Sequence, residues 1–479
     1  MKRREFLGLM TLAAGAMWTR AVETAAPDRR PLNFVFFLVD DLGARDVEPF
    51  GNTFYETPNV TRLAQRGMRF TNAYAACAVC SPSRASIMTG KYPARLHLTD
   101  WIPGEKPPPN AKLQPPDWCK HLPLEEVTVA EAFKKAGYST ALIGKWHLGD
   151  TDYSPEKQGF DVNIAGGHWG QPATYFSPYK HAYPNLPDGP QGEYLTDRLT
   201  DEALKFIEGH ATQPFLLHFC HYAVHMPLMA KPEMMEKYSA KAARLGQKWN
   251  PAYAAMVESV DQSLGRVLNR LEELKIADHT VVIFMSDNGG QLGATTNVPL
   301  RAGKGHPYEG GIREPLIIAW PGVVQAGSAC ATPVISTDFF PTMLDMAGLP
   351  LMPENHCDGV SLAPLLRQTG TLQRPALFWH FPHYRKSCHS PYGIVRQGDW
   401  KLIEFYEDGA AELFNLKDDE SETKNLAATN PAKTAELKAV LHQWREQVGA
   451  QMPTPNPNYR PGLKPKKKAK KETPPDNDP

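Results

Sequence analysis

The stretch Cys80-Ser81-Pro82-Ser83-Arg84-Ala85-Ser86-Ile87-Met88-Thr89-Gly90 decides how the rest of the chain is interpreted. It predicts a short helix, because Pro82 suits a first helical turn and Gly90 favours an end about two turns later. Cys80 then lies at the helix N-terminus, where unpaired N–H groups favour an anion, and Arg84 projects from the first turn. The pattern joins a sulfur nucleophile to an anion-binding helix end, although a buried structural Cys would also fit it.

The same stretch resembles the signature of the type I sulfatases: a Cys, a small residue, Pro, Ser and Arg, followed by a spaced Thr-Gly. In that family the Cys is oxidised after translation to formylglycine, an aldehyde that hydrates to a geminal diol. The resemblance implies that a formylglycine-generating enzyme or a sulfatase-maturing enzyme converts Cys80. Together with the motifs described below, it covers residues 33–426.

Length and composition limit the broad class of the protein. The 479 residues suffice for one large α/β domain or for two domains. Lys and Arg together number 52, as do Asp and Glu, so no net charge directs the chain to nucleic acid or a membrane surface. Seven cysteines cannot all pair internally, and Cys80 is the natural one to stay free, while spacing alone permits a local bridge from Cys77 to Cys80.

Residues 1–26 predict an export signal. Lys2, Arg3 and Arg4 precede an apolar run over residues 6–18 that is too short for an ordinary membrane-spanning helix. Arg3-Arg4-Glu5-Phe6-Leu7 fits a twin-arginine signal, with an ordinary secretory signal or an uncleaved anchor as alternatives. We therefore expect an exported protein, periplasmic or extracellular, with no membrane span in the mature chain.

Two apolar runs each end in acidic or amide side chains. Residues 33–39 are followed by Asp40-Asp41, and residues 280–286 by Asp287-Asn288-Gly289. Such runs predict buried, parallel strands, and open α/β sheets carry their sites at the carboxyl ends of such strands. A divalent cation held between the two ends would relieve the repulsion of the carboxylates. An Asp-capped turn and an Asn-Gly turn are the structural alternatives.

The resemblance assigns these side chains to one metal site. The ligands it implies are Asp40, Asp41, Asp287, Asn288 and the modified Cys80. Hard oxygen ligands suit calcium or magnesium and do not suit zinc. The family resemblance favours one calcium ion per chain over magnesium.

Further positions resemble catalytic segments of the same family. Lys145 and His147 are two residues apart, so on an extended segment they share a face. The resemblance implies that Arg84, Lys145 and Lys304 offset the charge of the sulfate oxygens. It also implies that His147 relays a proton with the diol, and that His225, with Lys304, protonates the leaving alcohol. Taken singly, these positions also fit a structural histidine or a solvated lysine.

Four polar residues in loops are candidate substrate-binding residues. His97 and Asp100 follow the Cys80 helix in a Pro-rich loop, His168 lies in a Gly- and aromatic-rich insertion, and His306 departs from the residues expected beside Lys304. Aromatic rings in such loops suit a sugar, although ordinary surface loops and packing of the insertion are equally simple explanations.

The motifs divide the chain into four parts. Residues 1–26 are the export signal, 27–373 a catalytic α/β sulfatase domain, 374–450 a C-terminal subdomain of short strands and a closing helix, and 451–479 a disordered Lys- and Pro-rich tail. The expected fold is α/β, alkaline phosphatase-like: a large mixed, mostly parallel sheet flanked by helices, with a smaller antiparallel sheet plus helix at the C-terminus.

The resemblance implies a sulfatase that hydrolyses sulfate esters with formylglycine and one calcium ion. Its expected substrate is a sulfated saccharide of the galactose or N-acetylgalactosamine type, because the loops look closest to bacterial enzymes of that kind. The alternatives are a phosphate or phosphonate ester hydrolase of the same superfamily, and a non-catalytic sulfoglycan-binding protein. Activity on matched aryl sulfates and phosphates distinguishes a sulfatase from a phosphate or phosphonate ester hydrolase. An unmodified Cys80 in the exported protein would favour the non-catalytic binding protein.

Overall fold

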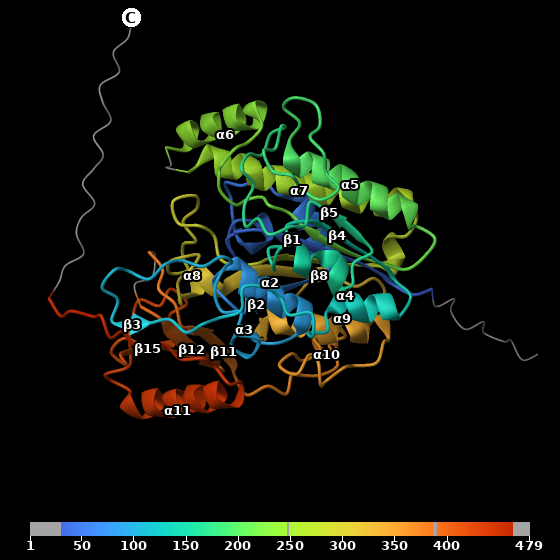
Figure 1. Ribbon diagram of the computed structural model, residues 1–479. Helices are drawn as coiled ribbons and strands as arrows, with labels where there is room; N and C mark the ends of the chain where they lie inside the picture. Colours follow the sequence, from blue (N-terminus) through green and yellow to red (C-terminus); the bar gives the residue numbers. More distant parts are fainter. Residues whose placement is uncertain (1–29, 247–248, 387–389, 463–479) are drawn as a thin grey trace, which may run out of the picture.

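The computed structural model describes residues 30–246, 249–386 and 390–462 (Figure 1). The predicted export signal lies outside these ranges. Within them, no helix combines the length and the apolar character that a bilayer span needs. The described chain forms one large sheet with helices on both faces and a smaller sheet beside it.

A mixed, mostly parallel sheet forms the centre of the structure, in the order β10-β2-β8-β7-β1-β6-β4-β5, with β9 also paired to β2. The run from β7 to β5 is parallel, whereas β8 is antiparallel to both of its neighbours. This sheet confirms the predicted α/β class. Its strands are β1 (Asn33–Val39), β2 (Met68–Tyr74), β4 (Ser139–Gly144), β5 (Val162–Ile164), β6 (Phe215–Cys220), β7 (Thr280–Ser286), β8 (Arg313–Ala319), β9 (Ser328–Cys330) and β10 (Val334–Ile335).

Alternate side chains of β1 enter two separate cores, because successive side chains of a strand point to opposite faces. Phe34 and Phe36 belong to one core, and Val35 and Phe37 to the other. Each such buried side chain stabilises the fold by about 1.5–3 kcal/mol. The Phe37 face is covered by α1 (Pro58–Arg66), α5 (Leu195–Gly209), α6 (Pro232–Leu245) and α7 (Pro251–Glu273); the Phe36 face is covered by α2 (Cys80–Thr89), α4 (Val129–Lys135), α9 (Phe339–Ala347) and α10 (Ala363–Leu366) (Figure 1).

The predicted helix at Cys80 is present as α2, and Gly90 ends it. Gly90 adopts the left-handed conformation, with φ at 67°, and its N–H donates to the Ser86 carbonyl at 2.9 Å. A Cβ atom added at Gly90 would lie 2.5 Å from the Cβ of His356. Conformation and space therefore both require glycine at the end of α2.

Helices α4 and α6 differ from what their sequences predict. Apolar residues at helical spacing predict a helix over residues 124–137, but α4 begins only after Thr128. There, Thr128 and Glu131 form a capping box in which each side chain accepts the other's backbone N–H. Helix α6 was not predicted. Its buried residues are Met234 and Tyr238 alone, so its sequence carries little apolar periodicity.

The smaller sheet is antiparallel, in the order β11-β12-β13-β14, and α11 packs on it (Figure 1). The sheet also packs against the segment that leads into α2, since Trp379 Nε1 donates to the Ala75 carbonyl at 2.7 Å. The predicted C-terminal strands and helix are therefore present, and they support the backbone before Cys80. The bounds are β11 (Leu377–Phe381), β12 (Tyr392–Gln397), β13 (Trp400–Phe405), β14 (Ala411–Asn415) and α11 (Pro431–Gln447). The other short α-helices and strands of the described residues are α3 (Pro93–Leu96), β3 (Leu113–Gln114), α8 (Glu309–Ile312) and β15 (Thr454–Pro455).

The start of the predicted disordered tail, residues 451–462, is instead placed against the Pro-rich loop. Strand β15 pairs antiparallel with β3, and Asn456 Nδ2 donates to the Ala111 carbonyl at 2.7 Å. Composition alone suggested disorder, but extended Pro-containing backbone is well suited to a short edge strand. The expectation for residues 463–479 falls outside the described residues.

A buried ion cluster joins the smaller sheet to α8. Lys401 Nζ lies 3.0 Å from Glu309 Oε1 and 2.7 Å from Glu422 Oε1, and all three side chains are fully buried. Removing the ammonium would leave two carboxylates buried without their cation, which is far more costly than losing a surface ion pair.

We expect Lys401→Met to lower the free energy of unfolding by about 3–5 kcal/mol. Chemical denaturation followed by tryptophan fluorescence measures the change. The matched control is Lys417→Met, because Lys417 is exposed and such surface changes stay within about 0.5 kcal/mol. If both variants had the same denaturation midpoint, the cluster would not hold the smaller sheet in place.

Candidate active site

The two predicted acidic strand ends meet at one edge of the sheet. Strands β1 and β7 are parallel neighbours, with Val39 opposite Ser286, so the residues that follow them lie side by side. Carboxylate oxygens of Asp40, Asp41 and Asp287 all lie within 4.8 Å of one another. Asn288 Nδ2 donates to Asp41 Oδ1 at 2.7 Å. The four side chains, each no more than 1% exposed, form one acidic cluster.

Three cationic side chains surround the acidic cluster, one for each carboxylate. Lys145 Nζ lies 2.7 Å from Asp40 Oδ2, and Lys304 Nζ lies 2.6 Å from Asp41 Oδ1. Arg84 approaches Asp287 Oδ2 with Nη2 at 2.8 Å and Nε at 2.9 Å. The structure thus brings together residues predicted from five separate segments of the sequence.

The surroundings do not stabilise the carboxylates of the acidic cluster equally. Burial, and then the charge of Asp287, raises the pKa of Asp40 well above its ordinary value. Burial has the same tendency at Asp41, but Lys304, His225 and Lys145 together outweigh it and lower the pKa of that carboxyl. Asp40 is therefore the carboxylate whose charge most needs a further cation.

The cluster also offers oxygen atoms that the protein leaves unused. Asp40 Oδ1 and Asn288 Oδ1 are buried and have no hydrogen-bond partner among the described residues. Buried acceptors without partners are rare, because each costs about 1–3 kcal/mol. Carboxylate and amide oxygens are the ligands of hard divalent cations. The residues present therefore fit a calcium-type ion.

Cys80, the first residue of α2, is held next to this cluster. It is 3% exposed, and both Cys80 and Cys77 are free thiols, so the local bridge that spacing permitted is absent from this part of the structure. The N–H of Gly305 donates to the Ala78 carbonyl at 2.8 Å, which places the Lys304 loop against the approach to Cys80. Despite burial, Asp41 and then Cys80 raise the pKa of Lys304, so its ammonium stays charged.

The two predicted catalytic histidines lie in different surroundings. His147 is 1% exposed; its Nε2 lies 2.6 Å from the Ile102 carbonyl, and its Nδ1 has no partner among the described residues. Burial, and then Lys145, lowers its pKa well below the ordinary value, so the ring is neutral and Nδ1 can accept a proton. His225 Nε2 lies 3.6 Å from Asp41 Oδ2. Burial, and then Lys304, lowers the pKa of His225 to about 3. At neutral pH the His225 ring is therefore neutral, and of the side chains His225 and Lys304 it is Lys304 that carries the proton.

Two of these residues have a strained backbone. Asp41 and His147 adopt left-handed conformations, with φ at 61° and 58°. For residues with a Cβ this costs about 1 kcal/mol or more, and such strain concentrates at functional sites. The acidic cluster and His147 are therefore arranged at the expense of local stability.

The four predicted substrate-binding residues make different contacts. His97 Nε2 contacts the Gly449 carbonyl beyond α11, at 3.0 Å, and His168 packs on the Trp169 ring at 4.4 Å between centroids. His306 Nδ1 lies 3.0 Å from the Gly303 carbonyl, within its own loop. Asp100 is 1% exposed and accepts the backbone N–H of Trp101 at 2.8 Å.

A polar cavity of about 560 Å³ includes Lys304 in its wall and so reaches the acidic cluster. Sequence reasoning missed part of its lining, because Lys106, Arg385 and Lys386 come from two loops without a motif. The sequence did point to Lys304 and to the neighbourhood of Trp101, which lies beside the predicted Asp100. The lining residues are Trp101, Gly104, Glu105, Lys106, Gln291, Lys304, Arg385 and Lys386.

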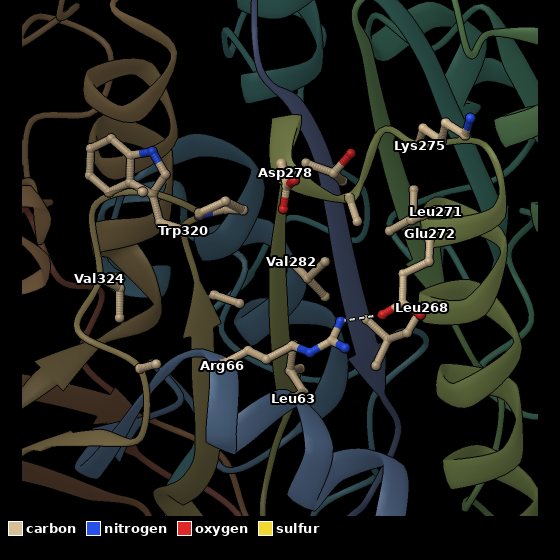
Figure 2. Close-up of a pocket in the computed structure, with 16 residues that line it drawn as sticks. Leu63, Arg66, Leu268, Leu271, Glu272, Lys275, Asp278, Val282, Trp320 and Val324 are labelled. Atoms are coloured by element: carbon tan, nitrogen blue, oxygen red, sulfur yellow. Dashed lines mark hydrogen bonds and ion pairs between the residues drawn. The ribbon is translucent and has the colours of Figure 1, made fainter.

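A second cavity, of about 640 Å³, lies at the other end of β7, and Figure 2 shows its lining. Thr280, the first residue of β7, borders it, whereas Asp287 follows the last residue of that strand. A seven-residue strand is roughly 20 Å long, so this cavity is remote from the acidic cluster. Its charged residues include Arg66 and Glu272, which pair with each other (Figure 2).

Comparison with known proteins gives two family matches. The Sulfatase family model matches residues 32–349, and the model described as N-sulphoglucosamine sulphohydrolase, C-terminal, matches residues 303–451. The first range contains the acidic cluster, its three cations and both histidines. The second contains the smaller sheet and α11.

Individual relatives agree with these matches. A Formosa agariphila protein named sulfatase is 34% identical over 474 residues, covering 84% of this chain and 85% of that protein. The N-acetylgalactosamine-6-sulfatase of Homo sapiens is 34% identical over 377 residues, covering 73% and 68%. The crystal structure of Ps i-CgsB in complex with k-i-k-neocarrahexaose superposes with a TM-score of 0.75 at 30% identity, covering 87% and 93%. This chain therefore belongs to the sulfatase family of enzymes.

Proposed function

We propose that this protein is an exported sulfatase that removes sulfate from a sulfated carbohydrate, using formylglycine at position 80 and one calcium ion. The observation that carries the proposal is the convergence at one sheet edge of three carboxylates, three cations and the N-terminus of the Cys80 helix. A structural Cys would have no need of such surroundings. The export signal predicted from residues 1–26 supports a periplasmic or extracellular location.

The acidic cluster would hold the calcium ion through Asp40, Asp41, Asp287 and Asn288, beside the modified Cys80. When bound, the ion would supply a Lewis acid for a sulfate oxygen, and the hydrated aldehyde would supply one hydroxyl to attack sulfur and a second to release sulfate. The free oxygens of Asp40 and Asn288 support this assignment.

The three cations of the site neutralise charge on the sulfate group. Arg84, Lys145 and Lys304 are buried and already oriented by their carboxylate partners, so little reorganisation is needed when negative charge builds up. Charge-assisted hydrogen bonds from such donors are about twice as strong as neutral ones. These side chains would bind the sulfate and stabilise the transition state.

The two histidines and Lys304 would move the protons. His147 is neutral and has a free Nδ1, which suits it to accept a proton from a hydroxyl at position 80. His225 and Lys304 contact the same carboxylate, Asp41, and would together protonate the leaving alcohol, with Lys304 holding the proton.

The substrate would be a sulfated sugar of the galactose or N-acetylgalactosamine type. The identity to an N-acetylgalactosamine-6-sulfatase supports this class. So does Trp101 at the edge of the polar cavity, because an aromatic face packs well on the apolar face of a sugar.

The proposed function is tested by sulfate release from a panel that contains N-acetylgalactosamine 6-sulfate, galactose 6-sulfate, glucosamine 6-sulfate and 4-nitrophenyl sulfate, with 4-nitrophenyl phosphate as the matched control. We expect turnover of the sulfates, with the galactose-type sugars preferred, and at least about 100-fold weaker turnover of the phosphate, a difference of about 2.7 kcal/mol. Equal or better turnover of the phosphate would overturn the assignment in favour of a phosphate ester hydrolase.

A further inference from the structure

The polar cavity beside the acidic cluster has an excess of positive charge that the proposed chemistry does not use. It is lined by Lys106, Lys304, Arg385 and Lys386, against one carboxylate, Glu105. Lys304 is committed to Asp41 and to the sulfate. The other three cations lie outward from it, and Lys386 is 95% exposed at the mouth. The cavity therefore presents positive charge from its inner wall to solvent.

Arg385 stands out among these cations because two of its nitrogen atoms are buried without hydrogen-bond partners. Its Nε and Nη1 make no hydrogen bond among the described residues. In contrast, the same two nitrogen atoms of Arg84 donate hydrogen bonds to Asp287 and to the Lys145 carbonyl. Leaving buried donors unpaired is costly, so such donors are rare in folded proteins. Nε and Nη1 of this Arg385 guanidinium are therefore available to donate to an anionic group of a ligand.

The charge of Arg385 reaches the nucleophile end of the site. Burial raises the pKa of Asp100 to about 7, and Arg385 is the strongest opposing influence, while Cys80 acts on the same carboxyl. Asp100 therefore lies within electrostatic range of both Arg385 and position 80.

The walls of the cavity are fixed relative to position 80. The N–H of Ile102 donates to Ser81 Oγ at 3.1 Å, and the Ile102 carbonyl contacts His147 Nε2 at 2.6 Å. Across the cavity, Lys386 Nζ lies 3.4 Å from Glu105 Oε1. The loop that contains Lys106 and the loop that contains Arg385 are thus connected to each other and to α2.

We propose that Arg385, with Lys106 and Lys386, binds a second anionic group of the substrate, next to the sulfate that is removed. The planar guanidinium suits an oxyanion such as a second sulfate ester or a uronate carboxylate, which it can bind with two parallel N–H donors. The enzyme then selects sugars that carry two or more negative charges. This inference rests on the proposed function only for the identity of the reacting sulfate.

Binding measurements on a Cys80→Ala protein test this inference without turnover. Isothermal titration calorimetry is carried out with N-acetylgalactosamine 6-sulfate, with N-acetylgalactosamine 4,6-disulfate, and with the 6-sulfated disaccharide that carries glucuronate. We expect at least one of the two doubly charged sugars to bind about tenfold or more tightly than the singly charged one. The tighter of the two identifies whether sulfate or carboxylate is the second group.

Substitutions in the same background locate the effect. We expect Arg385→Gln to reduce the preference for the doubly charged sugar to about twofold or less, Arg385→Lys to keep part of it, and Lys106→Gln to reduce it by a smaller factor, since Lys lacks the paired donors. The matched control is Arg244→Gln on the exposed surface of α6, which keeps the full preference.

Two results would overturn the proposal: equal affinity for all three sugars in the Cys80→Ala protein, or an undiminished preference after Arg385→Gln. Both are independent of catalysis. Absence of sulfate release by the unsubstituted protein would instead count against the proposed function. The ratios of the affinities measured on the Cys80→Ala protein would still decide the role of Arg385.

Discussion

Replacing Cys80 by Ser or Ala is expected to abolish multiple turnover of sulfate esters, with kcat lowered by about 10⁴-fold or more. A serine hydroxyl in this position could accept a sulfuryl group, but it has no second hydroxyl with which to expel it. Alanine offers no nucleophile at all. Steady-state release of 4-nitrophenol from 4-nitrophenyl sulfate measures the change, and a single-turnover burst from Cys80→Ser would reveal the trapped ester.

The matched control is Cys77→Ala, three residues earlier on the same segment. Cys77 is buried, and burial raises the pKa of its thiol to about 12, so it is an inert side chain at neutral pH. We expect this variant to keep most of the activity. Near-normal turnover by Cys80→Ser or Cys80→Ala would contradict a diol mechanism.

Asp40→Asn is expected to lower kcat/KM by about 10³-fold, because it removes a charge from the acidic cluster and the partner of Lys145. The substitution keeps the size of the side chain, so the loss would be electrostatic rather than steric. Lys145 Nζ, now 2.7 Å from Asp40 Oδ2, would face a neutral amide. Calcium affinity, measured by calorimetry on the chelator-treated protein, is expected to fall by at least about 10–100-fold.

Asp152→Asn is the control for this substitution, because the Asp152 side chain is 84% exposed and makes only a long contact with Lys157. It should leave both calcium affinity and activity unchanged. An Asp40→Asn protein that bound calcium as tightly as the unmodified chain would show that the cation is not held by the acidic cluster.

Much of the fold and most of the cluster could be predicted from the sequence, because both are encoded locally. The runs 33–39 and 280–286 are continuous and apolar, so they indicate buried strands, and each is followed directly by its acidic residues. Parallel pairing of these strands then makes the residues after them neighbours without further information. Cys80 and Arg84 lie within one helical turn, so their relation was also local.

What could not be predicted depends on contacts between distant segments. The antiparallel direction of β8 is set by its pairing with β2 and β7, and the sequence of β8 itself gives no sign of that direction. His97 looked suitable because it follows α2, yet its ring turns to Gly449, 352 positions later in the chain. Arg385 carried no signal, because its relation to position 80 depends on how the C-terminal subdomain packs.

The measurement that most directly tests whether position 80 is the reacting group is mass spectrometry of the tryptic peptide 70–84 from the native protein, compared with its specific activity. Conversion of Cys80 to formylglycine removes one sulfur and two hydrogens and adds one oxygen. We expect a peptide with this change at Cys80 and an intact Cys77, and sulfatase activity proportional to the converted fraction across preparations. Full activity in protein whose peptide carries only the Cys80 thiol would contradict the proposed chemistry.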